Sequence, residues 1–170
     1  MNDNSPQFQT SSLQIPVWED EDLSTTLYTA HATDPDSGSN GVILYSMAGD
    51  SSNTFKLNST SGEITLLRSL DYEQVQLYKL YIEARDQGNP PRTSTLSLTI
   101  SVLNVNDNSP VFSASSYVFN VSESALVQSN IDQVQATDRD GDHVSYSFRD
   151  SMYLNLFGIG SSSGYIYIKQ

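Results

Sequence analysis

One stretch near the middle of the chain decides the fold: Leu96-Ser97-Leu98-Thr99-Ile100-Ser101-Val102-Leu103-Asn104-Val105-Asn106-Asp107-Asn108-Ser109-Pro110. Its first half alternates apolar and hydroxyl side chains with a period of two, which is typical of a strand that is buried on one face. Its second half is polar and ends at a proline, which is typical of a connection. The stretch therefore predicts a β-strand followed directly by a linker.

The linker segment occurs twice in the chain. Asn2-Asp3-Asn4-Ser5-Pro6 recurs 104 residues later as Asn106-Asp107-Asn108-Ser109-Pro110. Glu19 matches Glu123 at the same distance, and the Ala-Thr-Asp-x-Asp motif that starts at Ala32 recurs from Ala136. Further along the chain the distance is 102 residues, as between Phe55 and Phe157. A repeat this long indicates tandem domains rather than the short units of a solenoid.

Other segments show the same period of two. Apolar residues at 78, 80, 82 and 84 alternate with more exposed types at 79, 81 and 83, and further β-rich runs lie at 117–121 and 165–168. Helical spacing of apolar residues is not sustained anywhere in the sequence. About seven such strands in roughly 100 residues predict an all-β fold, with an immunoglobulin-like Greek-key β-sandwich in each repeat.

The repeat sets the expected domain boundaries. We expect the end of an upstream linker at 1–4, a complete repeat at 5–105, a linker core at 106–108 and the amino-terminal part of a second repeat at 109–170. The second repeat lacks a counterpart of residues 69–105, so it should expose inner-face apolar residues and an open sheet edge. We therefore expect it to be only marginally folded by itself, and the chain to be a piece of a longer protein.

Composition limits the possible partners. The 170 residues include 8 basic and 20 acidic side chains, giving a formal charge of −12 and a pI near 4.2. Nucleic acid and anionic membrane surfaces would repel such a chain, whereas cations would be attracted. Cys is absent, which excludes disulfides, thiolate metal sites and cysteine nucleophiles. The sequence contains no run of the length of a membrane span, so the chain would meet a membrane only through a span outside it.

Acidic residues recur in pairs two positions apart. Such pairs are Asp34 with Asp36, Asp71 with Glu73, and Asp138 with Asp140. Clustered like charges destabilise a fold unless a cation lies among them. Carboxylate, amide and backbone carbonyl oxygens are the ligands that Ca²⁺ takes, whereas zinc prefers His or Cys, and the only histidines are His31 and His143. The pairs therefore favour calcium.

Three alternative interpretations of the sequence fail on motif spacing or structural context. An EF-hand loop needs an acidic or amide ligand at position 5 and Gly at position 6, where this chain has Gly38 in the first copy and His143 in the second. The Gly160-Ser161-Ser162-Ser163-Gly164 segment resembles the nucleophile elbow of a serine hydrolase, but a β-rich run follows it instead of a helix. A glycosidase would place its two acids across a cleft rather than on consecutive linker motifs. We therefore expect that the chain is not an enzyme.

Four motifs, in this order, resemble the motif set of extracellular cadherin repeats. They are the Asp-x-Asp loop, Leu70-Asp71-Tyr72-Glu73, Ala84-Arg85-Asp86, and Asn104-Val105-Asn106-Asp107-Asn108-Ser109-Pro110-Val111-Phe112. The resemblance covers the whole chain, as one full repeat and the first part of a second. Trp18 follows a linker, so this repeat is internal and looks more like the protocadherin or Fat and Dachsous type than the strand-swapping type.

The resemblance implies calcium ligands at each junction of repeats. At the central junction they would be Glu19, Asp71, Glu73, the carbonyl of Val105, Asn106, Asp107, Asn108, Asp138 and Asp140. At the amino end they would be Asn2, Asp3, Asn4, Asp34, Asp36, Asn40 and Asp86. The second repeat has no Asn that matches Asn40, and Asp142 or the His143 carbonyl is a candidate substitute. We expect two well-held Ca²⁺ ions at the central junction and one at the amino end.

The resemblance also implies a function. It is calcium-dependent cell–cell adhesion by the extracellular part of a plasma-membrane protein whose partners are other cadherin ectodomains, homophilic or heterophilic. Two alternatives stay open from the sequence. The repeats would be rigid spacers without partner contacts of their own, or the chain would be a calcium-dependent carbohydrate-binding or bacterial surface sandwich.

Two glycosylation sequons are present. They are Asn58-Ser59-Thr60, in an expected turn, and Asn120-Val121-Ser122, in an expected strand. Both have meaning only if the chain is secreted.

Overall fold

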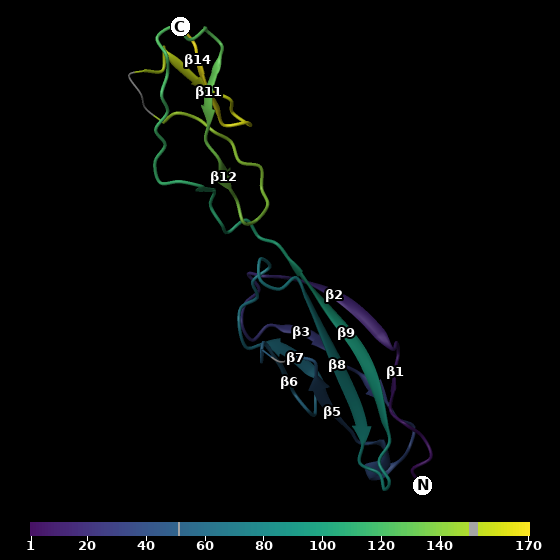
Figure 1. Cartoon of the computed structure of the whole chain (residues 1–170). Coiled ribbons are helices and arrows are strands. Elements are labelled where there is room, and N and C mark those ends of the chain that lie inside the picture. The colour runs from purple at the N-terminus through teal and green to yellow at the C-terminus, as the bar shows by residue number, and fades with distance from the viewer. Residues whose placement is uncertain (51, 150–152) are drawn as a thin grey trace. The chain divides into compact units, whose positions relative to one another are not determined.

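The computed structural model describes residues 1–50, 52–149 and 153–170 (Figure 1). These residues form two compact units, Met1–Val105 and Asn106–Gln170. Regular structure is β-strand throughout the described ranges, apart from one short 3-10 turn, η1 (Gly38–Gly41). None of the described helical structure is long and apolar enough to cross a membrane.

The first unit is built from nine described strands. They are β1 (Gln7–Phe8), β2 (Ser12–Trp18), β3 (Thr26–Thr29), β4 (Ala32–Thr33), β5 (Ile43–Ala48), β6 (Phe55–Leu57), β7 (Glu63–Leu66), β8 (Leu77–Asp86) and β9 (Thr93–Leu103). A four-stranded sheet has the order β2-β9-β8-β5, a three-stranded sheet has the order β3-β7-β6, and β1 pairs with β4 (Figure 1). All pairs are antiparallel except β2 with β9.

The core lies between the two larger sheets. Alternate residues of β8 and β9 point inward, and Leu80, Ile82, Leu98 and Ile100 are fully buried. They share one apolar cluster with Ile64 and other residues of the three-stranded sheet. The period of two in the sequence therefore corresponds to one face buried in a sandwich, as predicted.

The second unit has fewer strands. They are β10 (Val111–Phe112), β11 (Asn130–Gln133), β12 (Ala136–Thr137), β13 (Phe157–Ile159) and β14 (Tyr165–Ile168), and they form the pairs β10-β12 and β11-β14-β13. The 160–164 segment joins β13 to β14 as a turn between two strands, so it is not a nucleophile elbow.

The expected strand at 117–121 is not formed. The equivalent strand of the first unit, β2, is held by parallel pairing with β9, and the described part of the second unit has no counterpart of β9. Phe119 and Val121 instead line an apolar hollow of about 250 Å³, together with Ile131, Phe148, Tyr153, Leu154, Phe157 and Ile166. Three of these apolar residues, Val121, Tyr153 and Leu154, are exposed.

Candidate metal sites

Asp86 anchors the amino-terminal end of the first unit. It is the last residue of β8 and only 2% of its surface is exposed. Its Oδ1 accepts hydrogen bonds from the backbone N–H of Gly88 and of Arg92, both at 3.0 Å, and from Nδ2 of Asn2 at 3.2 Å. A carboxylate is therefore fixed in the interior by the turn that joins β8 to β9 and by the amino-terminal segment.

The Asp-x-Asp loop presents two more carboxylates at this end. The Asp36 carboxylate accepts hydrogen bonds from the backbone N–H of Asn4 at 3.0 Å and from its Nδ2 at 2.7 Å. The Asp36 N–H donates to Oδ1 of Asp34 at 2.9 Å. Asp3 contributes its backbone N–H to Asp36 at 3.2 Å, and Asn40 lies in η1, which follows the loop. The linker residues and the loop are thus held together.

Three buried oxygens at this end lack a hydrogen-bond donor among the described residues. They are Oδ1 of Asn2, Oδ2 of Asp34 and Oδ2 of Asp86. Burial of an unpaired acceptor is unfavourable, and more so for a carboxylate oxygen. Amide and carboxylate oxygens are also the ligands that Ca²⁺ prefers. These three oxygens are therefore of the chemical kind that a calcium ion binds.

Two carboxyl groups at this end, Asp36 and Asp86, have a pKa below the ordinary value. Hydrogen bonds from the side chain and backbone of Asn4 lower the pKa of Asp36. Burial raises the pKa of Asp86, but hydrogen bonds from Arg92, Gly88 and Asn2 outweigh it and hold that pKa below the ordinary value of 3.8. Both groups therefore carry the negative charge that a cation site needs.

Glu19 organises the other end of the first unit. It follows β2 directly, its N–H donates to the Leu103 carbonyl at 3.1 Å, and only 5% of its surface is exposed. One carboxylate oxygen accepts the N–H of Tyr72 at 2.7 Å and the other accepts the N–H of Val105 at 2.7 Å. Glu19 thereby fixes both the Leu70–Glu73 motif and the start of the linker.

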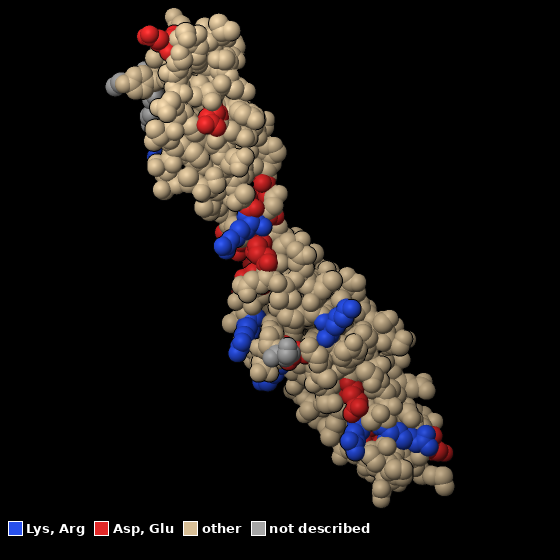
Figure 2. All heavy atoms as spheres, viewed as in Figure 1, with Lys and Arg blue, Asp and Glu red and all other residues tan. Residues whose placement is uncertain are grey.

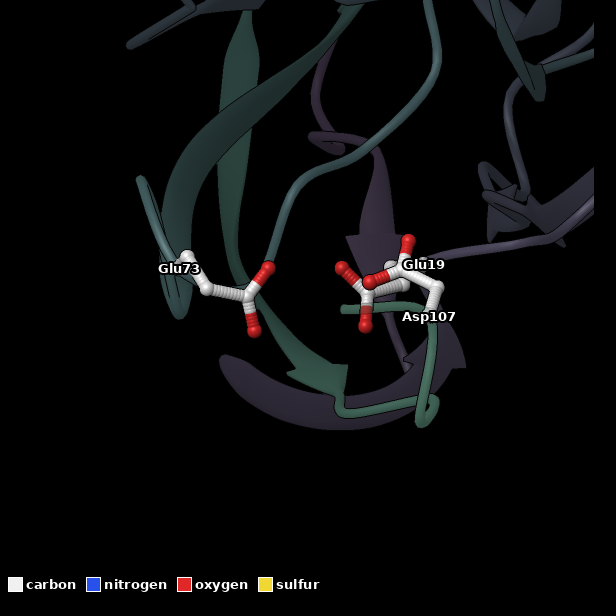
Figure 3. A group of neighbouring side chains, drawn as sticks. All are labelled: Glu19, Glu73 and Asp107. Atoms are coloured by element: carbon white, nitrogen blue, oxygen red, sulfur yellow. The ribbon is translucent and has the colours of Figure 1, made fainter. Parts of the chain in front are cut away.

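Three carboxylates gather at this end of the first unit. Ligand atoms of Glu19, Glu73 and the linker residue Asp107 lie within 4.8 Å of one another, and Figure 3 shows these carboxylates directed toward a common centre. Asp71 accepts hydrogen bonds from the backbone and side-chain nitrogens of Gln74. Like charges at this separation repel unless a cation neutralises them.

The second unit repeats the contacts of the amino end. Asn108 donates to the Asp140 carboxylate from its N–H at 2.9 Å and its Nδ2 at 2.7 Å, and the Asp140 N–H donates to Asp138 at 3.0 Å. The contact of the first linker asparagine differs, because Nδ2 of Asn106 donates to Asp142, whereas Nδ2 of its counterpart Asn2 donates to Asp86.

The structure adds groups that the sequence motifs did not identify. These are the backbone N–H groups of Gly88, Arg92 and Tyr72, which hold the buried carboxylates. Backbone donors leave no signal in residue identity, so sequence reasoning could not find them.

Figure 2 shows that charges on the visible face are sparse and occur in small groups, with most of the surface neither acidic nor basic.

Comparison with known proteins identifies the family. The Cadherin domain model matches residues 13–103, which is more than half of the chain. The chain therefore belongs to the cadherin family, as the motifs predicted, and it consists of extracellular-type adhesion repeats and is not an enzyme.

Individual relatives agree with this assignment. The chain is 38% identical over 185 aligned positions to Protein dachsous of Drosophila melanogaster, covering 99% of the chain and 5% of that protein. Among solved structures, mouse Cadherin-23 EC22-24 superimposes with a TM-score of 0.93 at 31% identity, covering 100% of the chain and 55% of that one. The protocadherin gammaB7 EC3-6 cis-dimer structure gives a TM-score of 0.91 at 30% identity, with coverages of 100% and 45%. The chain spans about one twentieth of the length of the curated relative.

Proposed function

We propose that this chain is a calcium-binding pair of ectodomain repeats in a cell-adhesion protein of the plasma membrane. Its role is to hold consecutive repeats in a fixed orientation when Ca²⁺ is bound. Family membership supports the adhesive role. The assignment of ions to residues rests on the carboxylate and amide geometry of this chain.

The observation that carries the proposal is the set of buried oxygens without donors. A hydrogen-bonded carboxylate such as Oδ1 of Asp86 needs no cation, but its Oδ2 is buried without a donor among the described residues. Asn2 and Asp34 each present a further oxygen of this kind. A divalent cation satisfies several such oxygens at once.

We assign ligands to the two ends of the first repeat as follows. Asn2, Asp3, Asn4, Asp34, Asp36, Asn40 and Asp86 serve the amino end, and Glu19, Asp71, Glu73, Val105, Asn106, Asp107, Asn108, Asp138 and Asp140 serve the central junction. The junction set includes six carboxylates, which three Ca²⁺ ions would neutralise. The ion nearest the second repeat should bind worst, because no Asn matches Asn40 there, so two ions are well held. Bound calcium supplies positive charge and a shared centre for ligands from successive repeats. Without it, the carboxylates repel and the linker is free to bend.

Other cadherin ectodomains are the partners that we propose. The gammaB7 structure is described as a cis-dimer, and its similarity to this chain supports contacts of the same kind. A rigid spacer without partner contacts of its own is the second candidate. Beads coated with the chain, mixed with and without Ca²⁺, distinguish the two, since only an adhesive module aggregates them.

Isothermal titration with Ca²⁺ tests the binding proposal. We expect two well-held ions at the central junction and one at the amino end. Asp107→Ala should remove binding at the central junction, while Asp22→Asn, which changes a scattered surface carboxylate, should leave the titration unchanged. If no ion binds more tightly than millimolar, the proposal is wrong.

A further inference from the structure

A surface turn in the first unit carries a motif that calcium binding does not use. Residues 58–62 join β6 to β7, and the sequon Asn58-Ser59-Thr60 begins this turn. Asn58, Ser59 and Thr60 are all exposed. A sequon on a surface loop of a secreted domain is an acceptor for an Asn-linked glycan.

The turn holds the Asn58 side chain in a defined orientation. Its Oδ1 accepts hydrogen bonds from the N–H of Thr60 at 3.0 Å, the hydroxyl of Thr60 at 3.1 Å and the N–H of Ser61 at 3.2 Å. The oxygen and nitrogen of a planar amide lie on opposite sides of its carbon. Because Oδ1 faces the backbone of the turn, Nδ2 is directed away from it.

The backbone around Asn58 is also fixed. Its N–H donates to the Glu63 carbonyl at 2.8 Å, and its carbonyl accepts the N–H of Gly62 at 3.0 Å. Gly62 has a φ of +76°, and a Cβ there would lie 2.2 Å from the Ala30 carbonyl oxygen, so only glycine fits. The acceptor therefore stands on a rigid turn whose folded form does not need to open to accommodate a glycan.

We propose that Asn58 is an Asn-linked glycosylation site. This inference rests on the proposed extracellular location, because the donor is an oligosaccharide carried on a polyprenyl diphosphate in the secretory pathway. Nδ2 of Asn58 attacks the anomeric carbon of the donor, forming the C–N bond as the C–O bond to the diphosphate breaks. The lipid diphosphate leaves, and the amide proton passes to a base of the transferase.

The position of the glycan has a structural consequence. Asn58 follows β6 directly, and β6 is the edge of the three-stranded sheet in the described structure. An exposed strand edge is a template for pairing with another chain unless something covers it. A bulky hydrated glycan beside β6 would oppose such pairing, and it is attached to none of the residues that we assign to calcium.

The second sequon provides an internal comparison. Asn120 is exposed in a segment without a strand, and its neighbours Phe119 and Val121 line the apolar hollow. In this sequon the Ser122 hydroxyl lies 2.8 Å from the Ser124 hydroxyl. In the first sequon the Thr60 hydroxyl instead donates to the acceptor residue, Asn58.

Secretion of the whole chain from animal cells tests the proposal. The secreted protein is treated with an amidase that removes Asn-linked glycans and converts the acceptor Asn to Asp, and its peptides are then mapped by mass spectrometry. We expect Asp at position 58 and loss of one glycan mass. Thr60→Ala should abolish that mass change while keeping the Thr60 and Ser61 N–H donors, and Thr60→Ser should retain it.

Ser122→Ala is the matched control, and it should leave the glycan at residue 58 in place. An unmodified Asn58 in the folded, secreted protein overturns the proposal, and so does modification at Asn120 alone. Calcium titration of unglycosylated protein made in bacteria is independent of this result. A failure of glycosylation is therefore distinguishable from a failure of calcium binding.

Discussion

The two carboxylate oxygens of Asp86 have opposite effects on the stability of the fold. Its Oδ1 is satisfied by the turn from Gly88 to Arg92 and by Asn2, and this arrangement stabilises the fold. Its Oδ2 is buried without a donor in the described structure, and this arrangement is unfavourable. A cation bound to Oδ2 would satisfy this oxygen, and Asp86 would then stabilise the folded chain through both of its carboxylate oxygens.

Asp86→Asn separates these two effects. The amide oxygen still accepts the backbone donors, while the negative charge is lost and an N–H₂ group replaces the buried Oδ2. We expect the stability in chelator at pH 7 to fall modestly, because the hydrogen bonds that lower the Asp86 pKa lose their ionised acceptor. We expect the Ca²⁺ affinity of the amino end to fall by about tenfold or more. Calorimetric titration of the variant and thermal unfolding in chelator measure the two effects, and an unchanged affinity would exclude Asp86 as a ligand.

The lowered pKa values of Asp36 and Asp86 predict a pH dependence. A carboxyl whose folded-state pKa lies below the ordinary value of 3.8 stabilises the fold above that value. This stability is lost as the pH falls through the lower, folded-state pKa. We therefore expect the contribution of these two groups to be constant from pH 7 to about 5 and to fall below about pH 4.

Urea unfolding in chelator across this pH range measures the effect. Asp36→Asn should flatten the loss at low pH, because the variant has one titrating group fewer. Stability that rises on acidification below pH 4 would contradict the assignment, since repulsion between the carboxylates would then dominate over their hydrogen bonds.

At the scale of elements, the sequence predicted a strand correctly where a neighbouring strand pairs with it, and wrongly where no such neighbour is present. The alternation of 96–102 predicted β9 because it reports one buried face directly, and the structure buries Leu96, Leu98, Ile100 and Val102. The run at 117–121 is also rich in residues with high β propensity, yet it forms no strand because no β9 equivalent in the described structure pairs with it. The hydrophobic period and the β propensity of a segment indicate which face it would bury as a strand. They do not indicate whether a neighbouring strand is present to pair with it.

The candidate sites were predictable to a similar extent. Recurrence of Asn-Asp-Asn and Asp-x-Asp identified the side chains, and the contacts of Asn4 with Asp36 recur between Asn108 and Asp140. The backbone donors that hold Asp86 and Glu19 depend on how the chain turns, so they required the structure.

The elements of the second unit should open more readily than those of the first. Among the large apolar residues that the structure describes in this unit, only Val134 and Ile168 are buried, while Val118 and Leu126 are 87% and 78% exposed. Amide hydrogen exchange of the whole chain in solution should therefore show lower protection for described strands β11, β13 and β14 than for β8 and β9. Equal and strong protection in both units would contradict this prediction.

At the scale of the whole molecule, the proposed calcium binding would take the place of other sources of stability. The chain has no Cys for disulfides and carries a net charge of −12, and self-repulsion from such a charge opposes the compact state. Part of this charge lies in one close group, because ligand atoms of Glu19, Glu73 and Asp107 are within 4.8 Å of one another. A ligand that binds these groups only in the folded state stabilises that state by mass action.

Thermal unfolding in Ca²⁺ and in chelator tests this account most directly. At a Ca²⁺ concentration about one hundred times the dissociation constant, we expect the Tm to rise by about 10–20 °C, from a linkage term of about 2.7 kcal/mol. Asp107→Ala should reduce this rise, and Asp22→Asn should not. Identical melting of the unmodified chain in Ca²⁺ and in chelator would contradict the account.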